Sequence, residues 1–193
     1  MVERVDRREP IDTATDRDLV DRARSGDLEA FEEIVRARSD AVYRLTYAIL
    51  GDEADARDAA QEAFVGAWRQ FGSLRDTARF DAWFQRLVVN AARMTHRARR
   101  RRGVREIPSS RVAGVAELPA TASPADVDAR RLDVALRRLD LDQRTILALH
   151  HLEGRSVAEL AEVLSIPEGT VKSRLHSARR ALQAALDAEA RDR

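Results

Sequence analysis

Cysteine is absent from this sequence of 193 residues, and glycine, proline and aromatic residues are scarce. Without cysteine the chain has no disulfide framework, no cysteine-ligated zinc and no thiol nucleophile. With 8 glycines and 5 prolines, the composition favours helices over a turn-rich β architecture. No apolar run approaches the roughly 20 residues that a membrane span requires, and no apolar segment follows the charged first residues. We therefore expect neither a signal peptide nor membrane insertion.

An excess of charge of one sign is also missing. The chain has 34 basic and 33 acidic residues, which gives a formal net charge of +1. Charged residues make up 35% and hydrophobic residues 44% of the chain, which is too charged for a membrane protein and too apolar for a disordered one. A balanced total argues against a nucleic-acid partner only if the two signs are evenly mixed along the chain. The positions of the charges therefore decide whether a basic surface for a nucleic acid is present.

Apolar residues recur at helical spacing in two blocks, and there is no strand signal, which predicts an all-α protein with two helical domains. We expect a disordered tail over 1–14, an N-terminal helical bundle over 15–102 and a C-terminal helix-turn-helix domain over 129–188. Glycine, proline, serine and threonine punctuate 103–128, which predicts a flexible linker between the domains. A short tail follows at 189–193.

Breaks in the apolar pattern divide the two domains into helices. Thr15 resembles the start of a capping box, which predicts that the first helix begins there. After a break at 25–27, a second helix is expected to carry Ala30, Phe31, Ile34 and Val35, and a further helical stretch Val42, Leu45, Ile49 and Leu50. Gly51 and Asp52 break this stretch, and the next helix is expected to carry the apolar residues from Ala56 to Phe71. A loop at 72–77 then precedes a long helix over about 78–102. In the second domain the expected helices cover 129–139, 141–152 and 156–164, and a last helix runs from after Pro167 to about Ala188.

The long helix over 78–102 carries what we call the arginine ridge. Between Asp81 and Glu106 the sequence contains no acidic residue. At about 100° per residue, six side chains fall within roughly an 80° sector: Arg79, Arg86, Asn90, Arg93, Arg97 and Arg100. A solvated face is the simpler interpretation, but it normally mixes signs because like charges one turn apart repel. We therefore interpret the ridge as a phosphate-binding surface for a nucleic acid.

Aromatic residues accompany the ridge, namely Phe71, Phe80, Trp83 and Phe84. Aromatic side chains stack on unpaired bases in proteins that bind single-stranded nucleic acids. At helical spacing beside Leu87, the same residues are also typical of a packed core. The sequence leaves both interpretations open.

The stretch 52–62 is acidic, with Asp52, Glu53, Asp55, Asp58 and Glu62 against Arg57. The helix dipole favours carboxylates at a helix N-terminus and accounts for the cluster by itself. A docking face for a basic protein partner is the functional alternative. Paired carboxylates also perform acid–base chemistry, but no nucleophile or metal ligand accompanies them here. We predict no catalytic residue, no metal site and no cofactor.

Residues 156–180 have the pattern of a helix-turn-helix. A short amphipathic helix over 156–164 is followed by a turn and by a second helix in which Val171, Leu175 and Ala178 face inward. There is no acidic residue over 170–186. This pattern matches a recognition helix that enters the major groove of DNA, although a hairpin used only for packing is the alternative. Lys172 and Ser173 are the expected base-reading side chains, and the arginines are expected to hold phosphates.

Two sets of motifs occur in a fixed order along the chain. The first domain contains GDLEAF at 26–31, DARDAAQEAF at 55–64 and FDAWF at 80–84, and the second contains LDLDQR at 139–144 and IPEGTVKSRL at 166–175. In this order and at this separation the motifs resemble a bacterial sigma factor of the extracytoplasmic-function (ECF) group, in the sigma-70 superfamily. The resemblance covers about 16–186. Ser177 stands where members often carry a basic residue, and Phe84 replaces a commoner leucine.

The resemblance implies an alternative sigma factor that binds core RNA polymerase and directs promoter recognition, DNA melting and transcription initiation. The residues that it assigns to the clamp helices of the polymerase β′ subunit are Asp55, Asp58, Gln61, Glu62 and Phe64. Apolar residues of the second domain would bind the flap of the β subunit, and the linker would thread the polymerase cleft. An anti-sigma factor is the implied regulator. The implied location is the bacterial cytoplasm, at the nucleoid when active or at the membrane when an anti-sigma factor holds the chain there.

The resemblance also assigns two promoter-DNA contacts. The segment 72–97 would bind and open the −10 element, and its loop 72–77 would receive a flipped base. The −10 residues would be Ser73, Arg75, Arg79, Trp83, Arg86, Asn90, Arg93 and Arg97. The −35 residues would be Thr170, Lys172, Ser173, Arg174, His176, Ser177 and Arg179.

Three other functions compete with this one. A stand-alone transcriptional regulator would use only the helix-turn-helix, bind promoter duplex without polymerase and leave the arginine ridge without a role. An enzyme would need clustered chemistry, but the 4 histidines are scattered, and the adjacent His150 and His151 point about 100° apart on a helix, which is poor geometry for one metal. A helical interaction scaffold explains the helices but not two separate basic faces.

Overall fold

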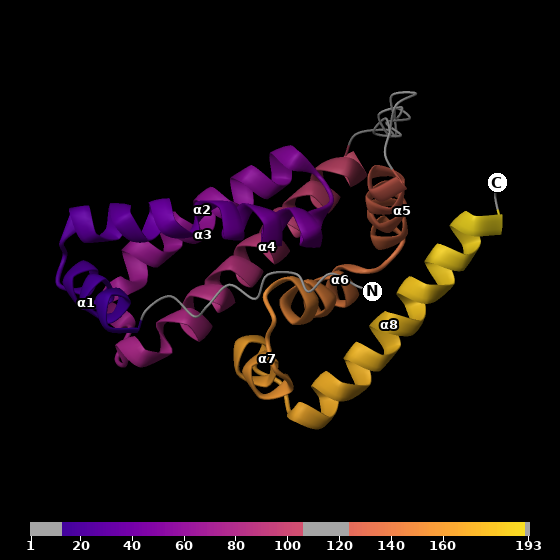
Figure 1. Cartoon of the computed structure of the whole chain (residues 1–193). Coiled ribbons are helices and arrows are strands. Elements are labelled where there is room, and N and C mark those ends of the chain that lie inside the picture. The colour runs from indigo at the N-terminus through magenta and orange to yellow at the C-terminus, as the bar shows by residue number, and fades with distance from the viewer. Residues whose placement is uncertain (1–12, 106–123, 192–193) are drawn as a thin grey trace.

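The computed structural model describes residues 13–105 and 124–191, and every element in these ranges is helical (Figure 1). The all-α prediction is confirmed for them. The predicted tail lies outside the described residues up to position 12, and the predicted linker lies outside them over 106–123. In the described part of the chain, no helix is long and apolar enough to cross a membrane.

Four helices form the N-terminal half: α1 (Thr13–Arg24), α2 (Leu28–Leu50), α3 (Glu53–Gln70) and α4 (Phe80–Arg105). Two 3₁₀ turns, Phe71–Ser73 and Thr77–Arg79, connect α3 to α4. The helices α2, α3 and α4 pack against one another, and α1 packs against α2 at one end of this bundle (Figure 1). The bundle thus places α4 and its arginine ridge on a rigid support.

The sharp turn between α2 and α3 comes from local chemistry at Gly51 and Asp52. Gly51 ends α2 in the left-handed region, with φ of 68°, which favours glycine. The Asp52 carboxylate accepts hydrogen bonds from the backbone N–H groups of Ala54 and Asp55, both at 3.0 Å, and so caps α3. These hydrogen bonds, together with the charge of Arg99, hold the pKa of Asp52 below its ordinary value.

The C-terminal half contains α5 (Pro124–Arg137), α6 (Leu141–Leu147), a π-helical turn (Ala148–Leu152), α7 (Val157–Leu164) and α8 (Glu168–Arg191). Reciprocal capping boxes start α6, between Asp140 and Gln143, and α7, between Ser156 and Glu159. The long α8 packs against α5, α6 and α7, so the three shorter elements support the predicted recognition helix.

Several predicted boundaries in the N-terminal half are wrong. The two stretches expected around Phe31 and around Leu45 form one helix, α2, because the charged segment between them contains neither glycine nor proline. The first helix begins at Thr13 instead of Thr15. Part of the segment expected in the long helix, Thr77–Arg79, forms a 3₁₀ turn, so α4 begins at Phe80.

Helical structure extends into the expected linker at both ends. Helix α4 continues to Arg105, and α5 begins at Pro124, a residue that is tolerated in the first turn of a helix because its missing N–H would have no partner there. The helix expected over 141–152 ends in a π-helical turn. Helix α8 continues to Arg191, into the predicted tail over 189–193.

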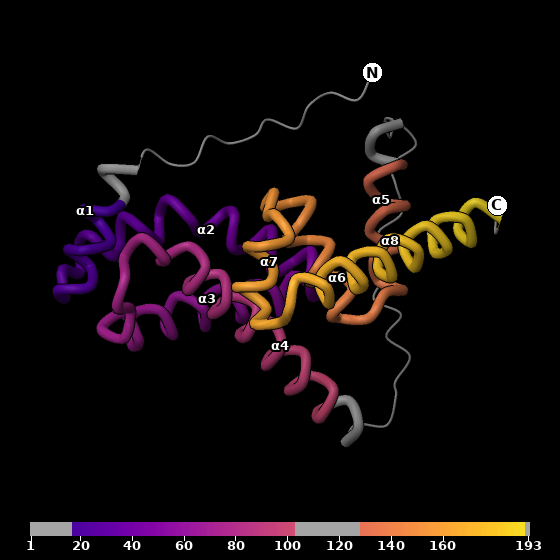
Figure 2. The backbone as a smooth tube through the Cα atoms, turned by 90° about the horizontal axis from the view of Figure 1, so that it is seen from below, coloured from indigo at the N-terminus to yellow at the C-terminus, as the bar shows by residue number. Residues whose placement is uncertain are grey.

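The two halves lie against each other. Helix α6 and the π-helical turn contact α2, and α7 contacts α4 (Figures 1 and 2). Buried apolar residues from both halves belong to a single core cluster. The face of α4 that meets α7 is the face that carries the arginine ridge.

Candidate nucleic-acid interface

The arginine ridge faces the C-terminal half along its first part. The Arg79 guanidinium pairs with the Glu162 carboxylate on α7, with Nε at 3.0 Å from Oε1. Arg86 Nη2 donates to the backbone carbonyl of the same Glu162 at 2.9 Å. Arg93 Nη2 lies 3.1 Å from Asp142 Oδ1 on α6. Three arginines predicted to hold phosphates are thus in contact with oxygen atoms of the chain itself.

The rest of the ridge is open to solvent. Asn90, Arg97 and Arg100 are exposed, and α4 continues past them to Arg105. The structure therefore brings the predicted ridge together along α4 and the 3₁₀ turn before it. Arg79, Arg86 and Arg93 contact the C-terminal half, although the Arg79 side chain remains 65% exposed.

The loop before α4 presents two of the predicted −10 residues. Ser73 and Arg75 are exposed, while Leu74 between them is 5% exposed and anchors the loop in the core. The Ser73 hydroxyl donates to the carbonyl of Gln70 at 2.6 Å, which closes the first 3₁₀ turn. The loop is thus held at its middle residue and presents the side chains on either side.

The aromatic residues form one connected group in the core. Phe71 stacks on Phe80 with ring centroids 5.5 Å apart, and Phe80 stacks on Phe84 at 5.6 Å. These three side chains are 2–4% exposed, so core packing is their role. Trp83 packs edge-on against Phe71 at 5.5 Å but is only half-buried. Of the four aromatics named from the sequence, Trp83 is the one with an accessible face.

The acidic face of α3 also has an exposed part and a part that packs against the rest of the chain. Asp58, Gln61 and Glu62 are exposed. Asp55 has a side chain that is 13% exposed, and it pairs with Arg99 Nη1 at 2.7 Å. Phe64 packs against Phe84 with ring centroids 5.3 Å apart. The accessible part of the predicted docking face therefore consists of Asp58, Gln61 and Glu62, while Asp55 and Phe64 support it from below.

The predicted recognition helix, α8, buries the face that the sequence pattern predicts. Val171, Leu175 and Ala178 are at most 4% exposed and face the interior. Thr170 is half-buried, and the other predicted −35 residues are exposed: Lys172, Ser173, Arg174, His176, Ser177 and Arg179. Arg174 and Ser177 border a shallow hollow of about 230 Å³ next to Asp140 and Asp142. The exposed face is long, polar and basic, which suits a duplex groove.

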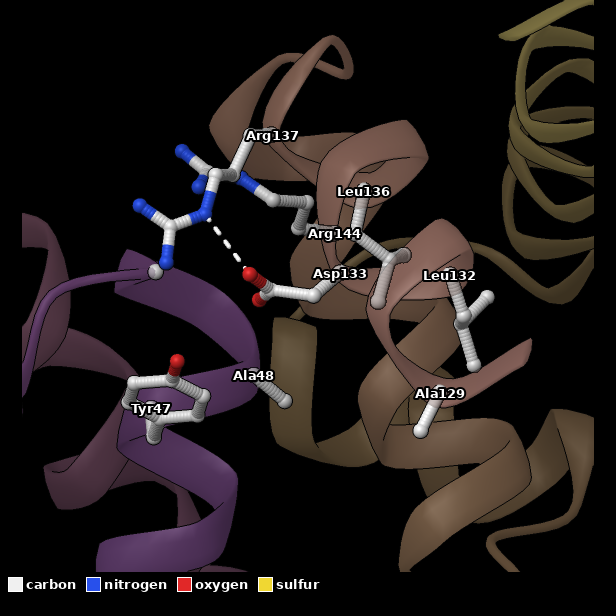
Figure 3. A pocket seen from close by; sticks show the side chains of 9 residues that line it. Tyr47, Ala48, Ala129, Leu132, Asp133, Leu136, Arg137 and Arg144 are labelled. Carbon is white, nitrogen blue, oxygen red and sulfur yellow. Dashed lines mark hydrogen bonds and ion pairs between the residues drawn. The ribbon is translucent and has the colours of Figure 1, made fainter. Parts of the chain in front are cut away.

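Sequence reasoning missed Arg144, which joins the two halves. Its side chain is 8% exposed, and Nη1 donates to the carbonyl of Leu50 at the end of α2, at 3.3 Å. Burial lowers the pKa of Arg144, and the neighbouring charge of Arg137 lowers it further. Figure 3 shows the two guanidinium groups close together at one side of a hollow of about 190 Å³, with Tyr47 and Leu132 also in its lining. No motif signals such a contact, because the partner is a backbone carbonyl.

Another contact between the two halves is also not signalled by the sequence. Gln85 Nε2 donates to Glu153 Oε2 at 3.3 Å, from α4 to the residue after the π-helical turn. Burial raises the pKa of Glu153, although Arg155, Arg44 and Arg38 act in the opposite direction. Among the described residues, no group of three or more side chains is placed to hold a metal ion.

Two family models match the chain in order. The model for sigma-70 region 2 matches residues 34–102, and the model for sigma-70, region 4 matches residues 129–182. The first range contains the acidic face of α3 and the arginine ridge. The second contains the helix-turn-helix.

Curated proteins are similar to the chain over most of its length. It is 33% identical over 184 residues to the RNA polymerase sigma-H factor of Pseudomonas aeruginosa, covering 89% of this chain and 93% of that one. It is 36% identical over 155 residues to the ECF RNA polymerase sigma factor SigM of Mycobacterium tuberculosis, covering 80% of this chain and 76% of that one.

Solved structures are similar as well. CnrH, solved in complex with the cytosolic domain of CnrY, is 28% identical with a TM-score of 0.66, and the match covers 90% of this chain and 97% of that chain. The sigma factor RpoE, solved with the anti-sigma factor NepR from Bartonella quintana, has the same fold with a TM-score of 0.64 and 24% identity, over 83% and 98% of the two chains.

Proposed function

Because the chain belongs to the ECF group of RNA polymerase sigma factors, we propose that it binds core RNA polymerase and directs it to a set of promoters. There it recognises the −10 and −35 elements and melts the DNA. The observation that carries this function is the pairing of two separate basic surfaces, the arginine ridge and α8, within matches to sigma-70 regions 2 and 4. The function is one of binding and uses no catalytic residue or cofactor.

The domains follow from the same assignment. Residues 15–102 act as the region 2 domain and 129–188 as the region 4 domain, with 103–128 between them. Two weak DNA contacts on one chain gain affinity through effective concentration, but only when a third body fixes their separation. Core polymerase fixes this separation, so the chain gains affinity from its two DNA-binding domains only when it is bound to polymerase.

The polymerase contact is the exposed acidic face of α3. Asp58, Gln61 and Glu62 are accessible on three successive positions of that face, and their charge fits a basic partner such as the clamp helices of β′. The ion pair between Asp55 and Arg99, at 2.7 Å, fixes the start of α3 against α4. Asp55 and Phe64 act by holding the face in place, and apolar residues of the region 4 domain bind the β flap.

The −10 contact combines the ridge with the loop before it. Arg79, Arg86, Arg93 and Arg97 neutralise backbone phosphates, with Asn90 among them. Ser73 and Arg75 lie beside the buried Leu74 in a loop of fixed shape, and this loop receives a base flipped from the stack. Unstacking one base costs a few kcal/mol, which phosphate pairing and the half-buried Trp83 offset without ATP.

The −35 contact is the exposed face of α8. Lys172, Ser173, His176 and Ser177 lie nearest the bases, and Thr170, Arg174 and Arg179 hold the phosphates on either side. Lys172 is a flexible point charge, whereas the arginines offer planar, forked donors that match phosphate geometry. The sequence-reading contacts therefore concentrate on a short segment of α8.

We infer a protein regulator as well. The similar protein CnrH is solved with the cytosolic domain of CnrY bound to it, which supports a protein partner for this chain, and an anti-sigma factor is the partner that we propose. The proposed location is the bacterial cytoplasm, at the nucleoid during transcription, and at the membrane if the anti-sigma factor is itself anchored there.

A run-off transcription assay on fragmented genomic DNA tests this function. With core polymerase and the chain, we expect transcripts that start at defined promoters and that core polymerase alone does not make. The matched control is the Asp58→Ala/Glu62→Ala variant, which keeps α8 and the ridge. A stand-alone regulator predicts the opposite pattern: sequence-specific duplex binding without polymerase, and no promoter-specific transcript.

A further inference from the structure

We propose that Arg99 of α4 is a positioning residue for the polymerase contact and not a contact to DNA. Its guanidinium joins the C-terminal part of α4 to the start of α3, the helix that carries the exposed docking residues. The inference rests on the proposed function of α3 as the polymerase-binding helix. It divides the basic segment 97–102 between two tasks, because Arg97 and Arg100 belong to the arginine ridge whereas Arg99 holds the docking helix in place.

Helices α3 and α4 are joined directly at one end only. There the two 3₁₀ turns, Phe71–Ser73 and Thr77–Arg79, connect the end of α3 to the start of α4. At the other end, Arg99 Nη1 lies 2.7 Å from Asp55 Oδ2 and 3.2 Å from Asp52 Oδ2. These ion pairs therefore fix the separation of the two helices at the end that the connecting segment does not reach.

Asp52 links this contact to the cap of α3. Its Oδ1 atom accepts hydrogen bonds from the backbone N–H groups of Ala54 and Asp55, while its Oδ2 atom faces Arg99. The Asp55 side chain is 13% exposed, so its charge needs a nearby cation. The hydrogen bond to Asp55 raises the pKa of Arg99 above its ordinary value. Two carboxylates at the start of α3 thus share one cation.

Arg99 lies on a different side of α4 from the arginine ridge. At about 100° per residue, its side chain is about 160° from Arg97 and about 120° from Arg93 around the helix axis. The contacts agree with this geometry, because Arg93 pairs with Asp142 on α6 whereas Arg99 pairs with Asp55 on α3. A nucleic acid that follows the ridge therefore runs along a side of α4 that Arg99 does not face.

The docking residues lie close to this contact along α3. Asp58 and Glu62 are exposed and follow Asp55 within about two helical turns. An ordered helix start presents them to polymerase in a fixed arrangement, whereas a frayed start must be ordered on binding, at a cost in affinity. Loss of Arg99 should therefore weaken polymerase binding without removing a contact between the chain and polymerase.

Hydrogen–deuterium exchange of the full chain, measured by mass spectrometry, compares the wild type with Arg99→Gln, Arg99→Lys and Arg101→Gln. Arg101 is the matched control, since it is an exposed arginine of the same segment. We expect Arg99→Gln to speed exchange over 53–62 and not over α8. Arg99→Lys should stay closer to the wild type because it keeps the charge, and Arg101→Gln should match the wild type. Exchange that rises equally over α8 would overturn the proposal, because Arg99 would then act on overall stability.

Affinity for labelled core polymerase, measured by fluorescence anisotropy, completes the positioning test. Arg99→Gln should bind about two- to fivefold more weakly than Arg101→Gln, the range for losing one partly exposed ion pair. Arg99→Lys should recover part of this loss, and it keeps the test informative if Arg99→Gln folds poorly. An affinity of Arg99→Gln equal to that of the control overturns the positioning role.

Binding to a single-stranded oligonucleotide without polymerase tests whether Arg99 contacts DNA. Arg99→Gln and Arg101→Gln remove the same charge, so we expect Arg99→Gln to bind the oligonucleotide no more weakly than Arg101→Gln. Weaker binding by Arg99→Gln would make Arg99 a DNA contact and overturn the proposal. Failure of the proposed function is a separate result, since it appears as absent promoter-specific transcripts with the wild-type chain and core polymerase.

Discussion

Arg144 donates a hydrogen bond from Nη1 to the carbonyl oxygen of Leu50, so a buried cation of the C-terminal half closes the last turn of α2 in the N-terminal half. The guanidinium lies against the Gly51 turn, where an added Cβ would meet Nη1 at 3.2 Å. The Gly51 turn therefore leaves little room beyond what this one side chain fills.

Arg144→Ala removes this contact and the packing of the side-chain stem. We expect the free energy of unfolding to fall by about 2 kcal/mol, because a hydrogen bond from a charged donor and buried methylene groups are lost together. Urea unfolding followed by circular dichroism measures it. The control Arg57→Ala breaks an exposed pair with Glu53 on α3 and should cost less than about 0.5 kcal/mol. Equal losses in the two variants would contradict the role of Arg144.

Glu153 gives the interface a pH dependence. Because burial raises its pKa, the folded chain holds this proton more tightly than the unfolded chain does. Its contribution to stability therefore grows as the pH falls from neutral through the raised pKa, and levels off below the pKa of an unfolded glutamate. Glu153→Gln should be more stable than the wild type at neutral pH, and the difference should shrink on acidification. A difference that does not change with pH would contradict this.

Substitutions at Phe84 and Trp83 distinguish a role in core packing from a role in DNA contact. Phe84 is 3% exposed and stacks on Phe80, so Phe84→Ala should cost about 3–5 kcal/mol of unfolding free energy. Trp83 is half-buried, so Trp83→Leu should retain more stability while weakening the melting of −10 DNA. Thermal unfolding and a melting assay on the same samples distinguish the two. A Trp83→Leu variant that melts DNA like the wild type would make Trp83 a core residue only.

Substitutions on α3 should weaken polymerase binding, and substitutions on α8 should weaken −35 recognition, each without affecting the other. Asp58→Ala/Glu62→Ala should weaken binding to core polymerase about tenfold, since each lost charge pair is worth up to about 1 kcal/mol. Lys172→Ala/Ser173→Ala should leave that affinity unchanged and weaken −35 recognition by about 1–3 kcal/mol per lost base contact. Fluorescence anisotropy with labelled core polymerase and labelled −35 duplex measures both. Equal loss of polymerase binding in both variants would mean that the DNA-reading face is misplaced.

Local patterns predicted a large part of the fold. The spacing of Val171, Leu175 and Ala178 identified the buried face of α8, and the break at Gly51 and Asp52 identified the turn between α2 and α3. The predicted helix boundaries were wrong where one residue type occurs in two structural contexts. Pro124 is typical of a linker, yet it begins α5 because proline fits the first turn of a helix.

The site was predicted as a set of surfaces but not as a set of contacts. The arginine ridge follows from helical periodicity, which the sequence contains. The contacts of the ridge arginines with Glu162 and Asp142 could not be predicted from the sequence. These two acidic residues lie in the other half of the chain, and no short-range pattern connects them to the ridge. Arg144 was missed for the same reason, since its acceptor is a backbone carbonyl of α2 that no side-chain motif marks.

Permanganate footprinting of promoter DNA, with a promoter taken from the run-off assay, measures whether the chain and polymerase together open the −10 element. With core polymerase and the chain, and without ATP, we expect reactive thymines across the −10 element. Core polymerase alone and the chain alone should both leave these thymines protected. Thymines that stay protected when both proteins are bound to the promoter would contradict the proposed melting function, because the chain would then place polymerase on DNA without opening it.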